Sequence, residues 1–229
     1  MQISPIMDEV WESGYLDAYD KVLLNTDIYR MVMGFHIDAM VGCRAVLDSG
    51  CGTGNVTLGL LKRGCMVSAL DPSSKAIGIL RAKCTGYENR LRTYNIGAEQ
   101  LPFEDRFFDG VTSMFVVHFM DDFEGYLREH YRVLKDNGLF ALTGRVSGEN
   151  MELVVQSYEG SLRRRGLLPM LEPEMRIIRE NITGSVRKAV RHKYAAADVE
   201  TMLRDIGFNE VAAVPNPYFG QCYSLLAKK

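Results

Sequence analysis

The chain has 229 residues, of which 47% are hydrophobic and 24% charged, and its formal net charge is −2. This balance is typical of a globular protein and excludes a disordered chain, and the small charge provides no general attraction to nucleic acid or membranes. The length predicts one large α/β domain, or one domain with an insertion.

The five cysteines form no Cys-x-x-Cys pair and no cluster with zinc-ligand spacing, so we predict no metal site. An odd number of cysteines and an acidic, polar N-terminus predict free thiols in a reducing compartment and no secretory leader. No apolar run approaches the ~20 residues that a membrane-spanning helix needs. We therefore expect a cytoplasmic protein without a membrane span, either a monomer or a homodimer.

Short apolar runs alternate with segments of helical periodicity along most of the chain. In chain order the pattern predicts strand 45–47, helix 55–63, strand 66–70, helix 73–83, strand 91–96, strand 109–114, helix 123–134, strand 139–143, helix 197–206 and strands 210–214 and 221–227. The dipeptide Asn137-Gly138 is predicted as the turn into strand 139–143. Such alternation indicates a parallel sheet with helices on both faces, which binds ligands at the carboxyl ends of its strands. Functional residues should therefore follow Leu47, Leu70, Ile96 and Met114.

Two segments depart from this alternation. Residues 1–44 are predicted to be largely helical, and residues 151–193 form a helical insertion with nine Lys/Arg and five Asp/Glu. We therefore predict a single domain with four parts: an N-terminal helical lid (1–44), a ligand-binding core (45–150), a helical insertion over the acceptor (151–193) and the C-terminal part of the core (194–229).

A glycine-rich turn, Asp48-Ser49-Gly50-Cys51-Gly52-Thr53-Gly54, lies between the first predicted strand and helix. Glycines there permit unusual backbone angles and let a ligand approach the main chain. A dinucleotide site needs Gly-x-Gly-x-x-Gly, and neither register fits, because Asn55 or Thr57 occupies the third glycine position. A carboxylate before the turn, Asp48, is tolerable beside a cationic sulfonium or ammonium group.

A second carboxylate, Asp71, ends the next predicted strand and is placed to accept hydrogen bonds from both hydroxyls of a ribose. Pro72 then fixes the chain as it turns away. Asp71 would serve a nicotinamide site equally well, and the structural alternative is that it only caps a helix.

Four segments in order resemble the motifs of class I S-adenosylmethionine-dependent methyltransferases. They are Val46-Leu47-Asp48-Ser49-Gly50-Cys51-Gly52-Thr53-Gly54, Ala69-Leu70-Asp71-Pro72-Ser73, Ala98-Glu99-Gln100-Leu101-Pro102-Phe103 with Phe107-Phe108-Asp109-Gly110-Val111, and Arg132-Val133-Leu134-Lys135-Asp136-Asn137-Gly138-Leu139-Phe140. Together they span about residues 44–145. The resemblance is strongest to small-molecule methyltransferases of the ubiquinone/menaquinone-biosynthesis type.

The resemblance implies a Rossmann-like three-layer α/β sandwich with a mostly parallel seven-stranded sheet, whose antiparallel last strand comes from the C-terminal pair. It also implies S-adenosylmethionine as the cofactor and S-adenosylhomocysteine as its product. The residues predicted to contact the cofactor, from the resemblance and, for Tyr19, from its spacing on a helix, are Tyr19, Asp48, Gly50, Cys51, Gly52, Asn55, Asp71, Pro72, Ala98, Glu99, Met114 and Phe115. Among them, Asp48 and the glycine turn would hold the methionine end, Asp71 the ribose, Ala98 and Glu99 the adenine, and Met114 and Phe115 would lie beneath the sulfonium.

The chain departs from this family at Gly97, where an Asp or Asn often binds the adenine amino group. Adenine recognition would then depend on the backbone, on Glu99 or on Gln100.

Methyl transfer mainly requires alignment of the nucleophile and exclusion of water, so no fixed catalytic signature is expected. His118, after the fourth strand, is the candidate general base, and a packing role is the alternative. His36 and His130 are interpreted as structural, and His192 as part of a solvated basic face.

Trp11, Tyr15 and Tyr19 share one helical face at i, i+4 and i+8. They are predicted either to cover the cofactor, with Tyr19 reaching its carboxylate, or simply to dock the helix on the core. The basic runs 163–165 and 187–193 are interpreted as solvated helix faces, with recognition of an anionic acceptor or of RNA as the alternatives.

The sequence therefore predicts an enzyme that transfers a methyl group to O, N or C of a small molecule, with an anionic acceptor as one alternative. An RNA methyltransferase, a nicotinamide-dependent oxidoreductase and a non-catalytic binding protein are the alternatives.

Overall fold

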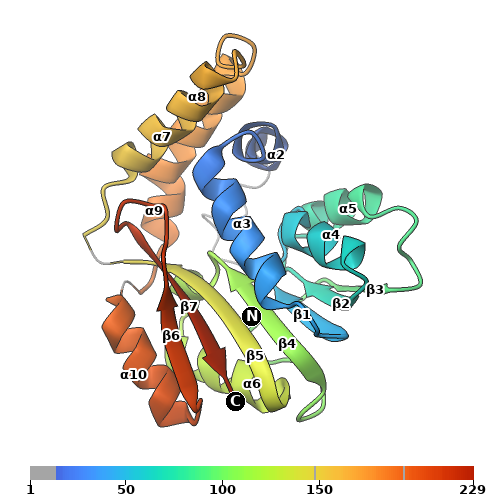
Figure 1. Ribbon diagram of the computed structural model, residues 1–229. Helices are drawn as coiled ribbons and strands as arrows, with labels where there is room; N and C mark the ends of the chain where they lie inside the picture. Colours follow the sequence, from blue (N-terminus) through green and yellow to red (C-terminus); the bar gives the residue numbers. More distant parts are fainter. Residues whose placement is uncertain (1–13, 147, 193) are drawn as a thin grey trace.

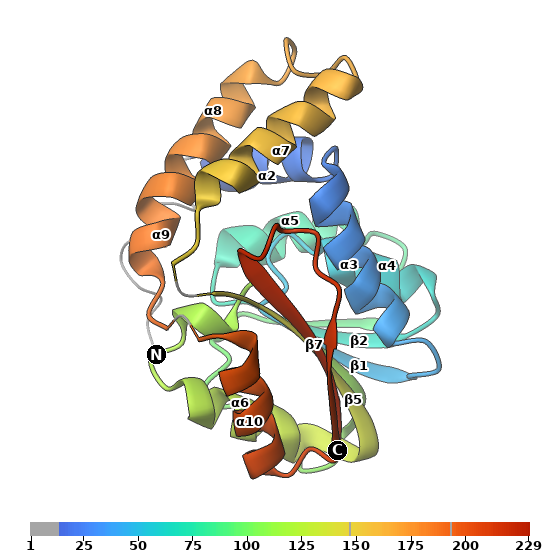
Figure 2. The same ribbon diagram turned by 60° about the vertical axis from the view of Figure 1, so that its left-hand side comes forward.

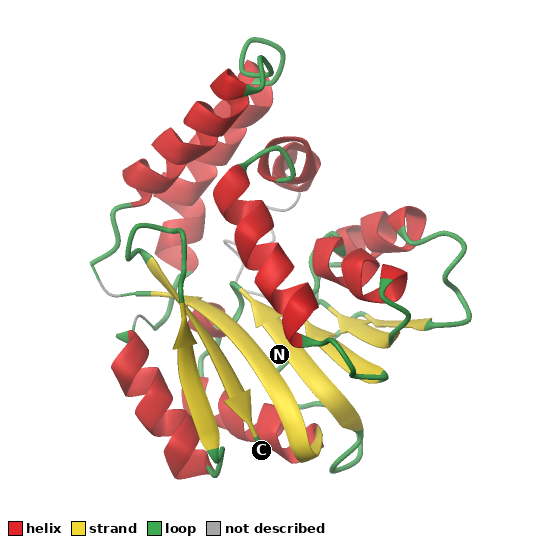
Figure 3. Cartoon of the chain, in the orientation of Figure 1, coloured by secondary structure: helices red, strands yellow, loops and turns green. Residues whose placement is uncertain are grey.

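The computed structural model describes residues 14–146, 148–192 and 194–229, and its centre is one seven-stranded sheet with the order β3-β2-β1-β4-β5-β7-β6 (Figure 3). The strands are β1 (Ala45–Ser49), β2 (Met66–Leu70), β3 (Leu91–Tyr94), β4 (Phe108–Met114), β5 (Leu134–Arg145), β6 (Glu210–Val214) and β7 (Cys222–Lys228). Strand β7 is antiparallel to both of its neighbours, whereas the pairs formed by β1 to β5 are parallel. The predicted fold class is confirmed.

Helices cover both faces of this sheet and give three layers (Figures 1 and 2). The helices packed on the sheet are α3 (Asp27–Ala39), α4 (Asn55–Lys62), α5 (Ser74–Lys83), α6 (Phe123–Val133) and α10 (Ala196–Ile206). On one face Leu60 and Leu61 of α4 and Leu80 of α5 are fully buried, in a cluster that residues of α3 also contact. On the other face Leu127 and Leu203 fix α6 and α10 in a separate apolar layer.

The element boundaries follow local chemistry at most positions. Ser73 caps α5 by accepting a hydrogen bond from the N–H of Ala76 at 3.1 Å, as its position before the helix predicts. The prediction for the fifth strand was too short, because β5 begins at Leu134, which pairs with Phe108. The predicted turn at Asn137 lies inside β5 as an irregularity with a left-handed φ of 62°, and regular pairing resumes at Leu139.

The third predicted strand was too long. It ends at Tyr94 rather than at 96. The side chain of Asn95 instead donates hydrogen bonds to the carbonyls of Asp71 and Pro72, at 3.0 and 2.8 Å. The residues after Tyr94 therefore run as a loop along the edge of the predicted site.

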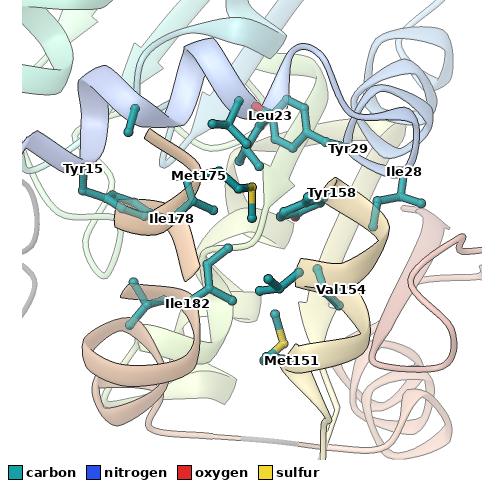
Figure 4. Close-up of a cluster of buried hydrophobic side chains, with 14 of the residues drawn as sticks. Tyr15, Leu23, Ile28, Tyr29, Met151, Val154, Tyr158, Met175, Ile178 and Ile182 are labelled. Carbon is teal, nitrogen blue, oxygen red and sulfur yellow. The ribbon is translucent and has the colours of Figure 1, made fainter. Parts of the chain in front are cut away.

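The N-terminal segment and the insertion together form a helical cap above the sheet. Its elements besides α3 are α2 (Leu16–Leu23), α7 (Met151–Arg164), α8 (Glu172–Glu180), a π-helical turn (Asn181–Ser185) and α9 (Val186–Ala189). Figure 4 shows that side chains of both segments, among them Leu23, Tyr29, Tyr158 and Ile178, fill one buried cluster. Two parts of the chain more than a hundred residues apart thus share a hydrophobic core.

Ion pairs between cap helices occupy several of the basic residues of the insertion. Arg164 and Arg165 each reach Asp27 at 2.7 Å, and Arg179 pairs with Glu152 and with Glu159. These guanidinium groups stabilise the cap locally. Only Arg164 and Arg165 belong to a basic run, and the interpretation of the runs as solvated helix faces stays a prediction. Among the described helices, none has the length and apolar character needed to cross a membrane.

Candidate functional site

The site lies where the strand order reverses, between β1 and β4. The chain leaves β1 for α4 and β2 on one side, and leaves β4 for α6 and β5 on the other. Such a switch point opens a crevice at the carboxyl ends of the strands. Here the crevice is a cavity of about 510 Å³ between the sheet and the cap helices. Every residue that the sequence predicts for the site lines this cavity: Tyr19, Asp48, Gly50, Cys51, Gly52, Asn55, Asp71, Pro72, Ala98, Glu99, Met114, Phe115 and His118.

The glycine turn is held close to the second strand. The N–H groups of Gly50 and Cys51 both donate to the carbonyl of Leu70 at 2.9 Å, and Gly50 and Gly52 have φ values of 74° and 50°. A Cβ at position 50 would lie 2.2 Å from Cγ2 of Val116, whereas one at position 52 would meet nothing within 4 Å. The main chain at Gly52 is therefore open to a ligand, as the motif predicts.

Two buried carboxylates flank this turn. Asp71 accepts hydrogen bonds from the N–H groups of Gly52 and Ser73, both at 2.9 Å, and Asp48 accepts one from the hydroxyl of Thr57 at 2.5 Å. Burial raises the pKa of Asp48 to about 7, with a further contribution from the charge of Asp71, and burial raises the pKa of Asp71 to about 6. A cationic ligand beside them would favour their ionised forms, so the chemistry of this end suits a sulfonium or ammonium compound.

A polar network attaches α2 of the cap to the glycine turn. Asp20 accepts hydrogen bonds from Thr53 at 2.7 Å, from Asn55 at 2.9 Å and from the ammonium of Lys83 at 2.7 Å. Asn55 also donates to the hydroxyl of Tyr29 at 3.0 Å and accepts from Lys83 at 2.6 Å. Asn55 therefore lines the cavity while its amide already serves this network. Sequence reasoning did not find the network, because its members come from four helices, α2, α3, α4 and α5, and from the glycine turn.

Aromatic rings of the cap cover the cavity. The ring centroids of Tyr15 and Tyr19 lie 5.7 Å apart, and those of Tyr19 and Tyr29 lie 5.6 Å apart in an edge-to-face arrangement. Tyr15 and Tyr19 share a helical face, as their spacing predicts. Trp11, the third residue of that predicted face, lies outside the described residues.

The loop after β3 closes the opposite end of the cavity. A Cβ at Gly97 would lie only 2.6 Å from Oε2 of Glu99, so the Glu99 carboxylate occupies the space that a side chain at position 97 would take. Gln100 is exposed and is not among the lining residues. Of the two side chains considered for adenine recognition, only that of Glu99 lines the cavity.

The histidines differ in their surroundings. His118 lies in a short 3-10 turn (Val117–Phe119) after β4, is 1% exposed, and its ring centroid is 4.3 Å from that of Phe119. His36 bonds to Thr112 at 2.5 Å and to Thr143 at 2.8 Å, and burial lowers its pKa to about 3.

The two remaining histidines make packing contacts. His130 bonds to the carbonyl of Tyr126 at 2.6 Å and to Ser49 at 2.8 Å, and burial lowers its pKa to about 4. His192 is partly exposed: its ring stacks on that of Tyr194 with centroids 5.8 Å apart and bonds to the carbonyl of Asp121 at 3.0 Å, so its place on a solvated basic face stays a prediction.

Sequence reasoning missed the part of the cavity beyond β4. This region is lined by residues of β5, the cap and the segment before β7, among them Arg145, Met151, Tyr158, Ile182, Tyr218 and Cys222. Arg145 is the last residue of β5, so the rule that ligands meet strand ends would have found it, had the predicted strand not stopped at 143. Within the described ranges, no group of three His, Cys, Asp or Glu side chains is arranged to hold a metal ion.

Comparisons with known proteins agree with this arrangement. Residues 47–142 match the family model described as a methyltransferase domain. A demethylmenaquinone methyltransferase of Tropheryma whipplei is 30% identical over 131 residues, which cover 52% of this chain and 54% of the relative. A ubiquinone/menaquinone biosynthesis C-methyltransferase of Brucella anthropi is 31% identical over 153 residues, with 58% of each chain covered. The chain thus spans about half the length of the curated relatives it matches.

Solved structures share the fold at lower identity. The 1,6-didemethyltoxoflavin-N1-methyltransferase of Burkholderia thailandensis, solved with S-adenosylhomocysteine, superposes with a TM-score of 0.64 at 21% identity, covering 98% of this chain and 87% of that one. A possible histamine N-methyltransferase of Thermotoga maritima gives a TM-score of 0.63 at 19% identity, covering 96% and 99%. The resemblance predicted from the motifs is confirmed: residues 47–142 match a methyltransferase domain, and the solved structures share the fold of this chain.

Proposed function

We propose that the protein is an S-adenosylmethionine-dependent methyltransferase that acts on a small molecule, of the ubiquinone/menaquinone-biosynthesis type. The observation that carries this proposal is the pair of buried carboxylates, Asp48 and Asp71, on either side of an open glycine turn at the switch point of the sheet. The names of the matched relatives support the reaction class. The position of the cavity between the sheet and the cap helices supports a small acceptor rather than a polymer.

The residues present fit S-adenosylmethionine along the length of the cavity. Asp71 would accept hydrogen bonds from the ribose hydroxyls, and Asp48 with the main chain at Gly52 would hold the methionine end. Glu99 and Ala98 would border the adenine. When bound, S-adenosylmethionine supplies a methyl group that its sulfonium already activates.

The chain itself would mainly orient the two reactants and exclude water. Met114 and Phe115 end β4 beneath the expected position of the sulfonium, and Phe115 has a φ of 62°, uncommon for a bulky residue. Tyr19 covers the methionine end from α2. A strand end and a lid helix thus enclose the reacting centre, which is the arrangement that in-line transfer requires.

His118 is proposed as a base for acceptors that must lose a proton. Its ring lines the cavity directly after Met114 and Phe115, so it is near the expected methyl position. The same ring packs on Phe119, which is what the alternative packing role requires.

Calorimetric titration with S-adenosylhomocysteine tests the proposal. Wild-type protein should bind it, and Asp71→Asn should weaken binding by about 10-fold or more, because a charge-assisted hydrogen bond is lost. Asp38→Asn is the matched control, since Asp38 is an exposed carboxylate paired with Arg63 away from the cavity. Failure of the wild-type protein to bind S-adenosylhomocysteine, or tighter binding of NADH than of S-adenosylhomocysteine, would contradict the proposal.

The acceptor side is tested by incubation with a methyl-deuterated donor. Mass spectrometry of a metabolite extract treated in this way should reveal a labelled small molecule. Labelled RNA without a labelled metabolite would contradict the small-molecule assignment.

A further inference from the structure

The strands β1 and β4 stop pairing with each other next to the cavity. Their ladder ends where Asp48 lies opposite Thr112, although β1 continues to Ser49 and β4 to Met114. On its other side β1 stays paired with β2 as far as Ser49, and β4 stays paired with β5 as far as Met114. The parting of β1 and β4 opens the crevice of the switch point, and it leaves the last residues of these two strands without a ladder between them.

A chain of buried side chains bridges this gap from helix α6. The hydroxyl of Tyr126 lies 2.7 Å from Oγ of Ser113 and 3.3 Å from Oγ of Ser49. Nε2 of His130 lies 2.8 Å from Oγ of Ser49, and Nδ1 of His130 lies 2.6 Å from the carbonyl oxygen of Tyr126. All four residues are buried. Side chains of one helix therefore connect β1 with β4 just beyond the point where their ladder ends.

The chemistry of these groups gives the hydrogen-bonded chain a single direction. Burial lowers the pKa of His130 to about 4, so its ring is neutral at neutral pH. Because a carbonyl can only accept, Nδ1 carries the ring proton, and Nε2 accepts the hydroxyl proton of Ser49. Ser49 then accepts from Tyr126, and Tyr126 accepts from Ser113. Every donor of the chain has an acceptor, and a fully satisfied buried network specifies one arrangement.

The chain lies beside the residues that we expect to hold the donor. Ser49 directly follows Asp48, and Ser113 directly precedes Met114. Asp48 and Met114 line the cavity. Since successive side chains of a strand point to opposite faces, Asp48 reaches Thr57 of α4 while Ser49 reaches α6. The end of β1 is thus held from both faces of the sheet.

The pair β4 and β5 is joined in a different way. His36 of α3 bonds to Thr112 of β4 at 2.5 Å and to Thr143 of β5 at 2.8 Å. This contact adds to a main-chain ladder that already joins the two strands as far as Thr143. The contact of Tyr126 with β1 and β4 has no such ladder beside it, so the hydroxyl of Tyr126 has more influence on the spacing of the strands that it connects.

The segments that follow β1 and β4 also approach each other closely. A Cβ at Gly50 would lie only 2.2 Å from Cγ2 of Val116. Apolar contact of this kind limits how near the two segments can come, but it does not limit how far they can separate. Hydrogen bonds are directional and of fixed length, so the chain through Tyr126 sets the outer limit.

We propose that Tyr126 and His130 are positioning residues for the donor. Their hydrogen-bonded chain replaces the missing ladder between β1 and β4, and it fixes the spacing between Asp48 and Met114. A ligand that extends from the methionine end to the sulfonium position meets both strands, so it binds tightly only when this spacing is correct. The inference rests on the proposed methyltransferase function, which supplies the donor.

The test compares two ligands that differ at the methionine end. S-adenosylhomocysteine is expected to meet both β1 and β4, whereas 5′-methylthioadenosine lacks the amino-acid part and needs only the ribose and adenine contacts of Asp71 and Glu99. Tyr126→Phe keeps the ring and removes the bridging hydroxyl. Calorimetry should show S-adenosylhomocysteine binding weakened by about 10-fold and 5′-methylthioadenosine binding changed by less than about twofold, because only a fraction of the protein then has the required spacing.

Two further variants test the bridge itself. Ser113→Ala opens the chain at its other end without a change in α6, and it should give the same selective loss. Tyr126→Phe/Ser113→Ala should lose about as much affinity as Tyr126→Phe alone, because both substitutions remove one bridge.

The matched control is Tyr131→Phe. It removes a hydroxyl from the same helix that lies against Gly207, where a Cβ would be 2.8 Å away from it. Neither ligand should change in affinity. A simple loss of folded protein would lower the binding of both ligands in proportion, so the ratio of the two affinities separates positioning from folding.

The outcomes distinguish this inference from the proposed function. Equal weakening of both ligands in Tyr126→Phe and Ser113→Ala, or an unchanged affinity for S-adenosylhomocysteine in both variants, would overturn the positioning role while the wild-type protein still binds S-adenosylhomocysteine. A wild-type protein that does not bind S-adenosylhomocysteine would overturn the methyltransferase proposal itself.

Discussion

At the scale of single residues, the site depends on where a few carboxylates lie. Asp48 and Asp71 are one residue type in two similar positions, each at the end of a parallel strand, and both are buried. The Glu99 carboxylate occupies the space beside Gly97 that a side chain at position 97 would take. The sequence showed that position 97 lacks a side chain, and the structure adds that the neighbouring Glu99 fills this space.

Glu99→Ala should weaken binding of S-adenosylhomocysteine by about 10-fold, because an acceptor for the adenine amino group is removed. Binding of S-inosylhomocysteine, which lacks that amino group, should not weaken. Gly97→Asp in the Glu99→Ala background should recover affinity, since the new carboxylate enters the space that Oε2 has left. Calorimetry on the three variants checks this, and equal weakening for both ligands would exclude the assigned role.

At the scale of elements, short-range patterns predicted the strands and helices of the core well. Both limits of β5 were predicted wrongly. The bulge at Asn137 resembled a turn and hid the beginning of the strand, because a left-handed Asn before Gly is typical of both. The predicted strand also stopped at 143, which hid Arg145 as a residue that lines the cavity. Helix α2 was predicted as a lid from its aromatic spacing, but its attachment through Asp20 involves α4 and α5 and left no pattern in the sequence.

Asp20→Asn should loosen the attachment of the cap to the glycine turn. The variant removes the charge partner of Lys83 and weakens an acceptor shared by Thr53 and Asn55, at a cost of about 1–3 kcal/mol. Hydrogen exchange of the α2 amides should be faster in the variant than in the wild type. Addition of S-adenosylhomocysteine should slow this exchange again. Asp17→Asn, an exposed carboxylate on the same helix, is the control. Unchanged hydrogen exchange in α2 would contradict the attachment of the cap to the glycine turn through Asp20.

At the scale of the whole molecule, the fold buries two carboxylates, Asp48 and Asp71, whose pKa values are raised by burial. The folded state binds the Asp48 proton more tightly than the unfolded state, since its pKa is about 7 instead of 3.8. The contribution of Asp48 to stability is therefore complete below pH 4 and is lost as the pH rises through 7. The buried His36 and His130 act in the opposite direction, because their pKa values are lowered.

Asp48→Asn should therefore gain stability relative to wild type as the pH rises from 5 to 7.5. The difference in free energy of unfolding should grow by at most about 1.4 kcal/mol per pH unit, the limit for one proton. Comparing variant with wild type cancels the histidine contribution. Urea unfolding at several pH values measures this, and a difference independent of pH would show that Asp48 keeps an ordinary pKa.

The donor side of the site could be predicted from the sequence because its residues come from short, contiguous segments at strand ends. The glycines within residues 48–54 indicate the backbone conformation of this turn, so the sequence of the turn alone predicts the kind of ligand it can bind. The part of the cavity beyond β4 could not be predicted, because its lining residues, among them Arg145, Tyr158 and Tyr218, are brought together only by the packing of the cap on the sheet. Sequence alone determined the fold class and the type of donor. Tertiary structure decided which other buried side chains line the cavity, since burial and proximity between distant segments exist only in the folded chain.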